Sequence, residues 1–501
     1  MKRRSFLQLA STAGALASLG ELGFLARLPL VSAAEAKLDP KMVRFHPDIE
    51  PLVRLLEETP RERVLEEVAA RIHRGTSYQQ ILASLLLAGV RNIQPRPVGF
   101  KFHAVLLVNS AHLASLASPD TDRWLPIFWA IDQFKSSQAQ DVREGDWTMG
   151  AVDESAVPSS HKARQAFIDA MDNWDEAAAD AAIVGLARTA GAHEIYELLA
   201  RYGARDFREI GHKEIYAANS FRALEAIGWQ HAEPVLRSLA YAMLDRAGDK
   251  ENPSKADLSA DRPYRHNLEA VSKIQSGWLD GKANPAATSE MLETVRTASP
   301  PEASDKAIEL LNGGAAPESL FAAFFDAAGE LMMRSPGILS LHATTFTNAI
   351  HYSWTHCHSE ETRKLLLLQN AAFLPLFRGN SKGTNVQIDR LEPLAGKGND
   401  VPGIDEIFDE ISRDRLSASR KILAHLKERN DPADFAQAAR RLIFLKGTNA
   451  HDYKYSSAVL EDYEAMRPPW RDRYLAASAF YLKGSGDHDN QLVQRTRAAL
   501  A

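Results

Sequence analysis

The sequence has almost no cysteine. Cys357 is the only one in 501 residues, which excludes an intrachain disulfide, a cysteine-built zinc site and an iron–sulfur cluster. The net charge is −6 and basic runs are absent beyond the first residues, so nucleic acid is not an expected partner. No apolar run reaches about 18 residues, so no stable membrane anchor is expected. Nucleophile-elbow, Walker, zincin and dinucleotide motifs are also absent.

The first residues have the composition of an export signal. Lys-Arg-Arg-Ser-Phe-Leu at 2–7 precedes a weakly apolar stretch and small residues at 31–34. This pattern predicts a twin-arginine signal peptide over 1–34, with an ordinary secretory leader as the alternative. The expected partner is the twin-arginine export machinery, and the expected location is the periplasm or the medium. This route carries folded proteins, commonly with a cofactor, which favours a metal or cofactor protein.

The periodicity of apolar residues is helical almost throughout. Alternating strand patterns are almost absent, so the fold class is predicted to be all-α, a multi-helix bundle with a metal centre between helices. We expect residues 35–501 to form one large helical domain. Helical faces are predicted at residues 81–87, 178–199, 235–244, 320–333, 362–377 and 416–426. Three stretches break this texture and are predicted to be loops: 245–267, 284–304 and 379–403.

A short pattern of histidine and asparagine occurs more than once. Residues 103–112 and 342–351 match at four of ten positions, with both histidines and the asparagine in register, and residues 212–220 have a similar texture. Residues nine apart lie on opposite faces of a helix, so each segment can direct one histidine to a shared centre. We take the first of each, His103, His212 and His342. His231 is an alternative to His212.

The fourth candidate lies near the C-terminus. His451 and Lys454 are three residues apart and share a face if this turn is helical. Four helices would then each supply one histidine to a site that suits iron, zinc, copper or nickel. For Lys454 the alternative is a salt bridge with Glu461 or Asp462. A rival cluster is formed by His351, His356, Cys357 and His358, of which 356–358 are predicted to lie in a polar loop between helices.

Four segments of the chain resemble the questin oxidase-like family. They are Leu-His-Ala-Thr-Thr at 341–345, Ala-His-Asp-Tyr-Lys at 450–454, and the two helices that begin at His103 and His212. That family includes non-haem iron oxygenases that open anthraquinone rings. The resemblance implies one iron bound by His103, His212, His342 and His451, and by Lys454 carboxylated to a carbamate. The export leader departs from the intracellular fungal relatives, so the substrate is not carried over.

Together these observations predict an exported, metal-dependent oxidoreductase. The expected reaction is O₂-dependent ring cleavage or Baeyer–Villiger-type oxidation of a cyclic or aromatic organic substrate, with Fe(II) as cofactor and zinc, manganese or copper as alternatives. Two other hypotheses stay open. One is a non-catalytic periplasmic helical scaffold or binding protein with structural histidines. The other is a zinc or copper hydrolase, or a metal carrier, that uses the histidines at 351–358.

Overall fold

Helices account for the ordered structure. The computed structural model describes residues 42–246, 248–379, 383–429 and 431–500, and within these ranges it contains 22 α-helices and no β-strand. The prediction of an all-α fold is therefore confirmed. The predicted signal peptide lies outside the described residues. Residues 43–501 form one compact unit.

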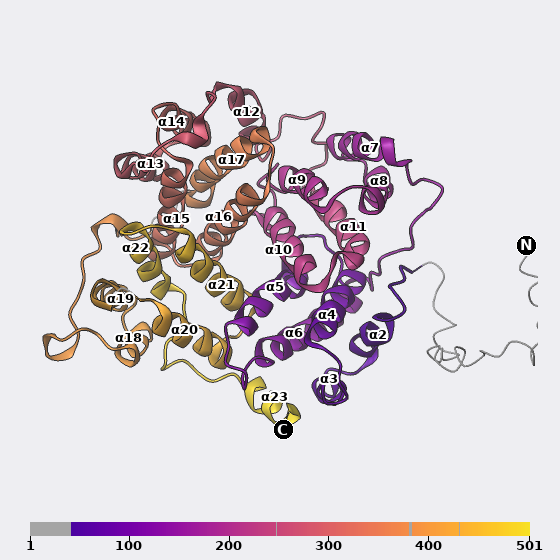
Figure 1. The fold of residues 1–501 in the computed structure, drawn as a ribbon, viewed down its shortest axis with the longest axis horizontal. Coiled ribbons are helices and arrows are strands. Elements are labelled where there is room, and N and C mark those ends of the chain that lie inside the picture. The colour runs from indigo at the N-terminus through magenta and orange to yellow at the C-terminus, as the bar shows by residue number, and fades with distance from the viewer. Residues whose placement is uncertain (1–41, 247, 380–382, 430, 501) are drawn as a thin grey trace, which may run out of the picture. The chain divides into compact units, whose positions relative to one another are not determined.

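Four helices form a closed ring at the centre of this unit (Figure 1). Each helix of the ring packs against the next, in the order α5, α10, α16, α21 and back to α5. They are not neighbours in sequence, because each is separated from the next by several other helices. The ring consists of α5 (His103–Leu116), α10 (His212–Ile227), α16 (Ile338–His356) and α21 (Ala450–Ala465).

The other helices surround this ring. α6 packs on α5, α9 and α11 on α10, α17 and α15 on α16, and α20 and α22 on α21. These outer helices shield the ring from solvent, so its side chains lie in the core. Their bounds are α2 (Glu50–Glu58), α3 (Val64–His73), α4 (Tyr78–Asn92), α6 (Leu125–Glu144), α7 (Ser160–Asn173), α8 (Glu176–Thr189), α9 (Ala192–Gly203), α11 (Ala232–Met243), α12 (Arg262–Ala270), α13 (Pro285–Thr297), α14 (Pro300–Asn312), α15 (Pro317–Arg334), α17 (Glu360–Arg378), α18 (Ile404–Ile411), α19 (Arg415–Arg429), α20 (Ala433–Lys446), α22 (Trp470–Ala477) and α23 (Leu492–Leu500).

Two sequence predictions about local structure were wrong. The face predicted over 178–199 is divided between α8 and α9, because the chain is extended at Ala190 and Gly191. The predicted loop at 284–304 is instead two helices, α13 and α14. Asn284 caps the first through the backbone N–H groups of residues 286 and 287, and Ser299 forms a capping box with Glu302 at the second. Caps of this kind start helices in polar, proline-containing sequence.

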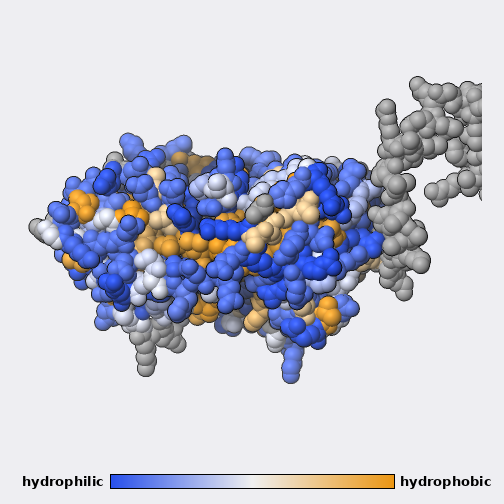
Figure 2. Space-filling view, turned by 90° about the horizontal axis from the view of Figure 1, so that it is seen from below, coloured by the Kyte–Doolittle hydropathy of each residue, from blue (hydrophilic) through white to orange (hydrophobic). Residues whose placement is uncertain are grey.

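The face of the molecule seen in Figure 2 is mainly polar. Seen from below, hydrophilic residues cover most of the molecule, and hydrophobic residues are gathered near the middle of that face (Figure 2). None of the described helices has the length and apolar character needed to cross a membrane.

Candidate metal centre

Three of the predicted histidines meet inside the ring. His103, His212 and His342 place one ligand nitrogen each within 4.8 Å of one another. The Nε2 atom of His212 lies 3.1 Å from Nε2 of His103 and 2.8 Å from Nε2 of His342. Among the residues that the structure describes, this is the only such group of histidine, cysteine or carboxylate side chains. We call these three residues the histidine triad.

The backbone holds each ring of the triad in one orientation. Nδ1 of His103 lies 2.8 Å from the carbonyl oxygen of Phe100, and Nδ1 of His212 lies 2.7 Å from that of Glu209. Nδ1 of His342 lies 2.6 Å from the carbonyl oxygen of Ile338. A carbonyl oxygen only accepts, so each Nδ1 carries the proton and donates. In a neutral ring the Nε2 atom then has a free lone pair.

The lone pairs of the triad therefore point at one another. Two imidazole acceptors at 2.8 Å and 3.1 Å repel unless a cation lies between them. Two nitrogens bound to one metal at about 2.0–2.1 Å are about 2.9 Å apart at a 90° angle and about 3.3 Å apart at a tetrahedral angle. The triad thus has the spacing of adjacent ligands to one metal ion, and Nδ1–H bonds to carbonyls are the usual support for such ligands.

His451 and Lys454 lie beside the triad on α21. The ring centroid of His451 is 4.3 Å from that of His103 and 5.4 Å from that of His342. A capping box at Asn449 and Asp452 begins the helix and sets the position of His451. Nε2 of His451 and Nζ of Lys454 are buried and have no hydrogen-bond partner among the described residues. Both atoms are therefore available to a ligand.

The site lacks a negative charge. Burial lowers the pKa of Lys454 to about 7. Burial, reinforced by Lys454, lowers the pKa of His451 to about 3. Burial is also the largest cause that holds the pKa of each triad histidine well below its usual value. Lys454 and the neighbouring histidines lower the pKa of each ring further. The four histidines are consequently neutral near pH 7, and about half of the Lys454 amine is neutral there. The neutral form of these groups is the one that binds a metal cation.

Glycine and left-handed residues bring two of these histidines close. Phe100 (φ 45°) and Gly99 (φ 143°) turn the chain just before His103, and an added Cβ on Gly99 would lie 3.2 Å from Cε1 of His212. Gly211 (φ 83°) precedes His212, and an added Cβ there would lie 2.6 Å from Cδ2 of Phe346. The absence of a side chain at Gly211 therefore permits the close approach of α10 to Phe346 on α16.

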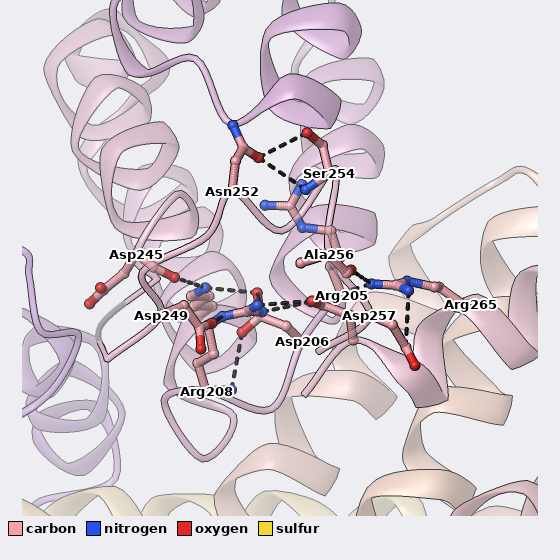
Figure 3. A network of polar contacts seen from close by, with 12 residues as sticks. Arg205, Asp206, Arg208, Asp245, Asp249, Asn252, Ser254, Ala256, Asp257 and Arg265 are labelled. Carbon is pink, nitrogen blue, oxygen red and sulfur yellow. Dashed lines mark hydrogen bonds and ion pairs between the residues drawn. The ribbon is translucent and has the colours of Figure 1, made fainter. Parts of the chain in front are cut away.

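Buried ion pairs fix the segment that leads into α10. The Arg208 guanidinium donates to Asp261 at 2.6 Å and 2.9 Å and to Asp249 at 2.6 Å. Figure 3 shows Arg208 among the acidic side chains of this network. Lys213, next to His212, donates to Asp206 at 2.8 Å. The carbonyl that orients His212 belongs to this segment, so the network supports the site.

The remaining candidates lie elsewhere. His112, which faces away from His103 on α5, hydrogen-bonds the Tyr78 hydroxyl at 3.0 Å, and His351 packs against Phe325, so the opposite-face prediction is confirmed for both helices. His231 ends a 3₁₀ turn, Trp229–His231, and does not belong to the triad. The structure thus brings His212, rather than His231, to the centre.

The rival cluster does not assemble. His356 belongs to the last turn of α16, not to a loop, and its Nδ1 donates to the Tyr352 carbonyl at 2.8 Å. Cys357 is 3% exposed, and burial raises the pKa of its thiol. His358 contacts the ring of His193 instead. These side chains therefore do not converge on one point.

The salt bridge considered for Lys454 is also wrong. Glu461 pairs with Arg222 at 2.6 Å, and Asp462 accepts from Asn348 at 2.7 Å and from the Tyr474 hydroxyl at 2.7 Å. Both carboxylates are thus occupied by other donors, and Lys454 points into the ring.

The fold and the site define an all-α protein with a buried histidine triad that could hold a metal ion. No protein-family model, curated protein or solved structure matches the chain. The resemblance to the questin oxidase-like family therefore stays a prediction, which depends on the residues around the four histidines and Lys454.

Proposed function

We propose that this protein is a metal-dependent oxygenase whose metal is held by His103, His212, His342 and His451. The observation that carries the proposal is the pair of Nε2–Nε2 distances, 2.8 Å and 3.1 Å, between rings whose Nδ1 atoms already donate elsewhere. The 2.8 Å distance is that of two ligands at about 90°, whereas 3.1 Å lies midway between the 90° and the tetrahedral values. The shorter distance favours a metal of higher coordination number, such as iron or manganese, over a four-coordinate zinc.

Lys454 is proposed to complete the ligand set as a carbamate. Four neutral imidazoles leave a divalent cation without an anionic ligand, and the triad includes no carboxylate of the described chain. A buried amine with a pKa of about 7 is substantially neutral near pH 7 and can add CO₂, whereas an exposed lysine cannot. The resulting carboxylate would supply the missing charge next to the triad.

Exposed apolar side chains beside the site support an organic substrate. The residues whose carbonyls orient His103 and His342 are Phe100 and Ile338, and their side chains are 75% and 51% exposed. Leu339, the next residue, is 43% exposed. We call these three residues the apolar rim. Exposed apolar side chains beside a polar site are typical of a place where an apolar molecule binds.

Each group has a defined part in the proposed reaction. A bound iron(II) supplies the O₂ chemistry. The triad and His451 hold the ion, and the carbonyls of Phe100, Glu209 and Ile338 keep the imidazoles in the ligating tautomer. The apolar rim binds the ring of the substrate and excludes water from its reacting face.

The test is metal analysis of protein purified without chelator or nickel. We expect about one iron per chain, lost in His212→Ala and His342→Ala, because each removes a central ligand. His112→Ala is the matched control, since it changes a histidine on α5 that faces away from the site. Zinc at the same level would refute the oxygenase chemistry, because zinc undergoes no redox change. Absence of metal in folded protein would leave the scaffold hypothesis.

The lysine has a separate test. Lys454→Ala should weaken metal binding, and Lys454→Glu should restore part of it, because a glutamate supplies a carboxylate without CO₂. Carbon-13 NMR of protein incubated with labelled bicarbonate should show one carbamate signal that both variants lack. A wild-type protein that binds iron without this signal would refute the carbamate and leave the histidine site intact.

A further inference from the structure

A polar layer lies one to two helical turns below the triad. Asn109, Asn219 and Asn348 follow His103, His212 and His342 by six or seven residues on their helices. Nδ2 of Asn109 lies 3.4 Å from Oδ1 of Asn219, and Arg222 reaches both Asn219 at 3.3 Å and Asn348 at 3.4 Å. Helices α5, α10 and α16 therefore run parallel, with histidines at one level and asparagines at the next. We call this the asparagine layer.

A small pocket passes through this layer. Its lining includes Lys454, Arg222 and Glu461 together with the three asparagines. It has room for about one water molecule. Lys454 is 2% exposed and Glu461 lies seven residues, or about 10 Å, further along α21, where its side chain is 39% exposed. The pocket thus leads from the buried amine toward the surface, on the side of the lysine away from the triad.

An ion pair closes the outer end. Nη2 of Arg222 lies 2.6 Å from Oε2 of Glu461, and Nδ2 of Asn348 donates to the same oxygen at 2.7 Å. Inside this pair, Oδ1 of Asn109, Nε of Arg222 and Nζ of Lys454 are buried without a hydrogen-bond partner in the described part of the chain. Buried polar atoms in this state usually bind water. The passage is therefore polar, with room for about one water molecule beside these atoms.

We propose that this pocket is the route by which CO₂ reaches Lys454, separate from the apolar rim where the organic substrate enters. The inference rests on the proposed carbamate. The lysine nitrogen forms a bond to the carbon of CO₂, one C=O π bond opens to a carboxylate oxygen, and one N–H proton leaves. Pocket water carries that proton past Glu461 to solvent. CO₂ is small enough for the passage, whereas an organic ring is not.

The experiment measures how fast the carbamate forms in the metal-free protein after labelled CO₂ is added, and how fast iron then binds. Ala458→Met and Asn109→Leu fill the pocket from α21 and α5, and each should slow both rates at least tenfold with the same final stoichiometry. Glu461→Ala opens the outer end at a partly exposed residue and should accelerate both. Val142→Ala changes an exposed residue that lines neither the pocket nor the apolar rim, so it is the control and should leave both rates unchanged. Phe100→Ala, at the apolar rim, tests entry of CO₂ from the other side.

The outcomes separate this inference from the proposed function. Unchanged rates in the folded pocket variants, with a wild-type carbamate present, would overturn the CO₂ route and leave the carbamate standing. A change in Phe100→Ala equal to that in the pocket variants would overturn it as well, because CO₂ would then enter at the rim. A wild-type protein that forms no carbamate overturns both the CO₂ route and the proposed carbamate. Glu461→Ala, which changes a partly exposed side chain at the outer end of the pocket, decides the case if the filled variants do not fold.

Discussion

Replacement of Lys454 by methionine should stabilise the metal-free protein while weakening its metal binding. The wild-type amine is buried, has no hydrogen-bond partner among the described residues, and has a pKa lowered by burial from 10.5 to about 7. Between these values the unfolded chain binds a proton that the folded chain does not. Wild-type stability therefore rises with pH across pH 7–10.5, and the cost of the lysine is largest below pH 7.

The size of the effect follows from this shift. At about 1.4 kcal/mol per pKa unit, the lysine costs about 4 kcal/mol at pH 7 and about 2 kcal/mol at pH 9. Lys454→Met removes this cost and fills a similar volume with an apolar side chain. Urea unfolding in the presence of chelator should therefore show the variant more stable by about these amounts, with the difference shrinking as the pH rises.

A destabilising lysine is what a functional site would retain and a structural scaffold would not. If Lys454→Met is less stable than wild type at pH 7, or if the difference does not change between pH 7 and pH 9, the amine is charged and paired in the folded protein. The argument for a reactive neutral amine would then fail. Lys446→Met provides a control, because its ammonium pairs with Asp489 at 2.9 Å and its replacement should not stabilise the protein.

Three further predictions concern α10 and the contacts that hold it. Gly211 precedes this helix, Asp261 pairs with Arg208 ahead of it, and Glu214 lies on it and accepts a hydrogen bond from Ser353. Gly211→Ala should cost at least about 1 kcal/mol and weaken metal binding, because the new Cβ meets Phe346 and the residue is left-handed; a calorimetric melt and a metal titration check both. Asp261→Asn should cost about 3 kcal/mol, because it removes the bidentate partner of the buried Arg208 guanidinium; unchanged urea unfolding would contradict the role given to this network. Glu214→Gln should stabilise the protein at pH 8 but not at pH 4. Burial holds the pKa of this carboxyl well above its usual value, so the wild type loses stability as the pH rises above the unfolded value of about 4.3. Equal stabilisation at both pH values would show that the carboxyl is ionised in the fold.

Helix geometry explains how far the site was predictable. The 100° turn per residue allowed only one histidine of each pair, 103/112 and 342/351, to face a common centre, and the structure places His103 and His342 there. The three-residue spacing of His451 and Lys454 places both beside the triad on α21. The repeated asparagine was visible as part of the same pattern. Its role as a second polar layer was not, because that depends on which helices are neighbours.

Other features depended on contacts that no local pattern encodes. The choice between His212 and His231 was open in the sequence, and it was decided by the ring of four helices. The histidines at 351–358 looked like a cluster because they are close in sequence, but a helix directs them to different neighbours. Lys454 had two acidic residues within reach on its own helix, and both are taken by Arg222, Asn348 and Tyr474 from elsewhere in the fold.

The sequence by itself determined the all-α class, the absence of cysteine-based chemistry and which face of each helix a histidine occupies, because these follow from composition and from a 3.6-residue period. Tertiary structure alone decided that four helices far apart in the chain run side by side. Only this packing brings the Nε2 atoms of His212 and His342 to 2.8 Å and leaves Lys454 buried without a counter-ion among the described residues. Burial sets the pKa of a side chain through its surroundings, and those surroundings exist only in the folded protein.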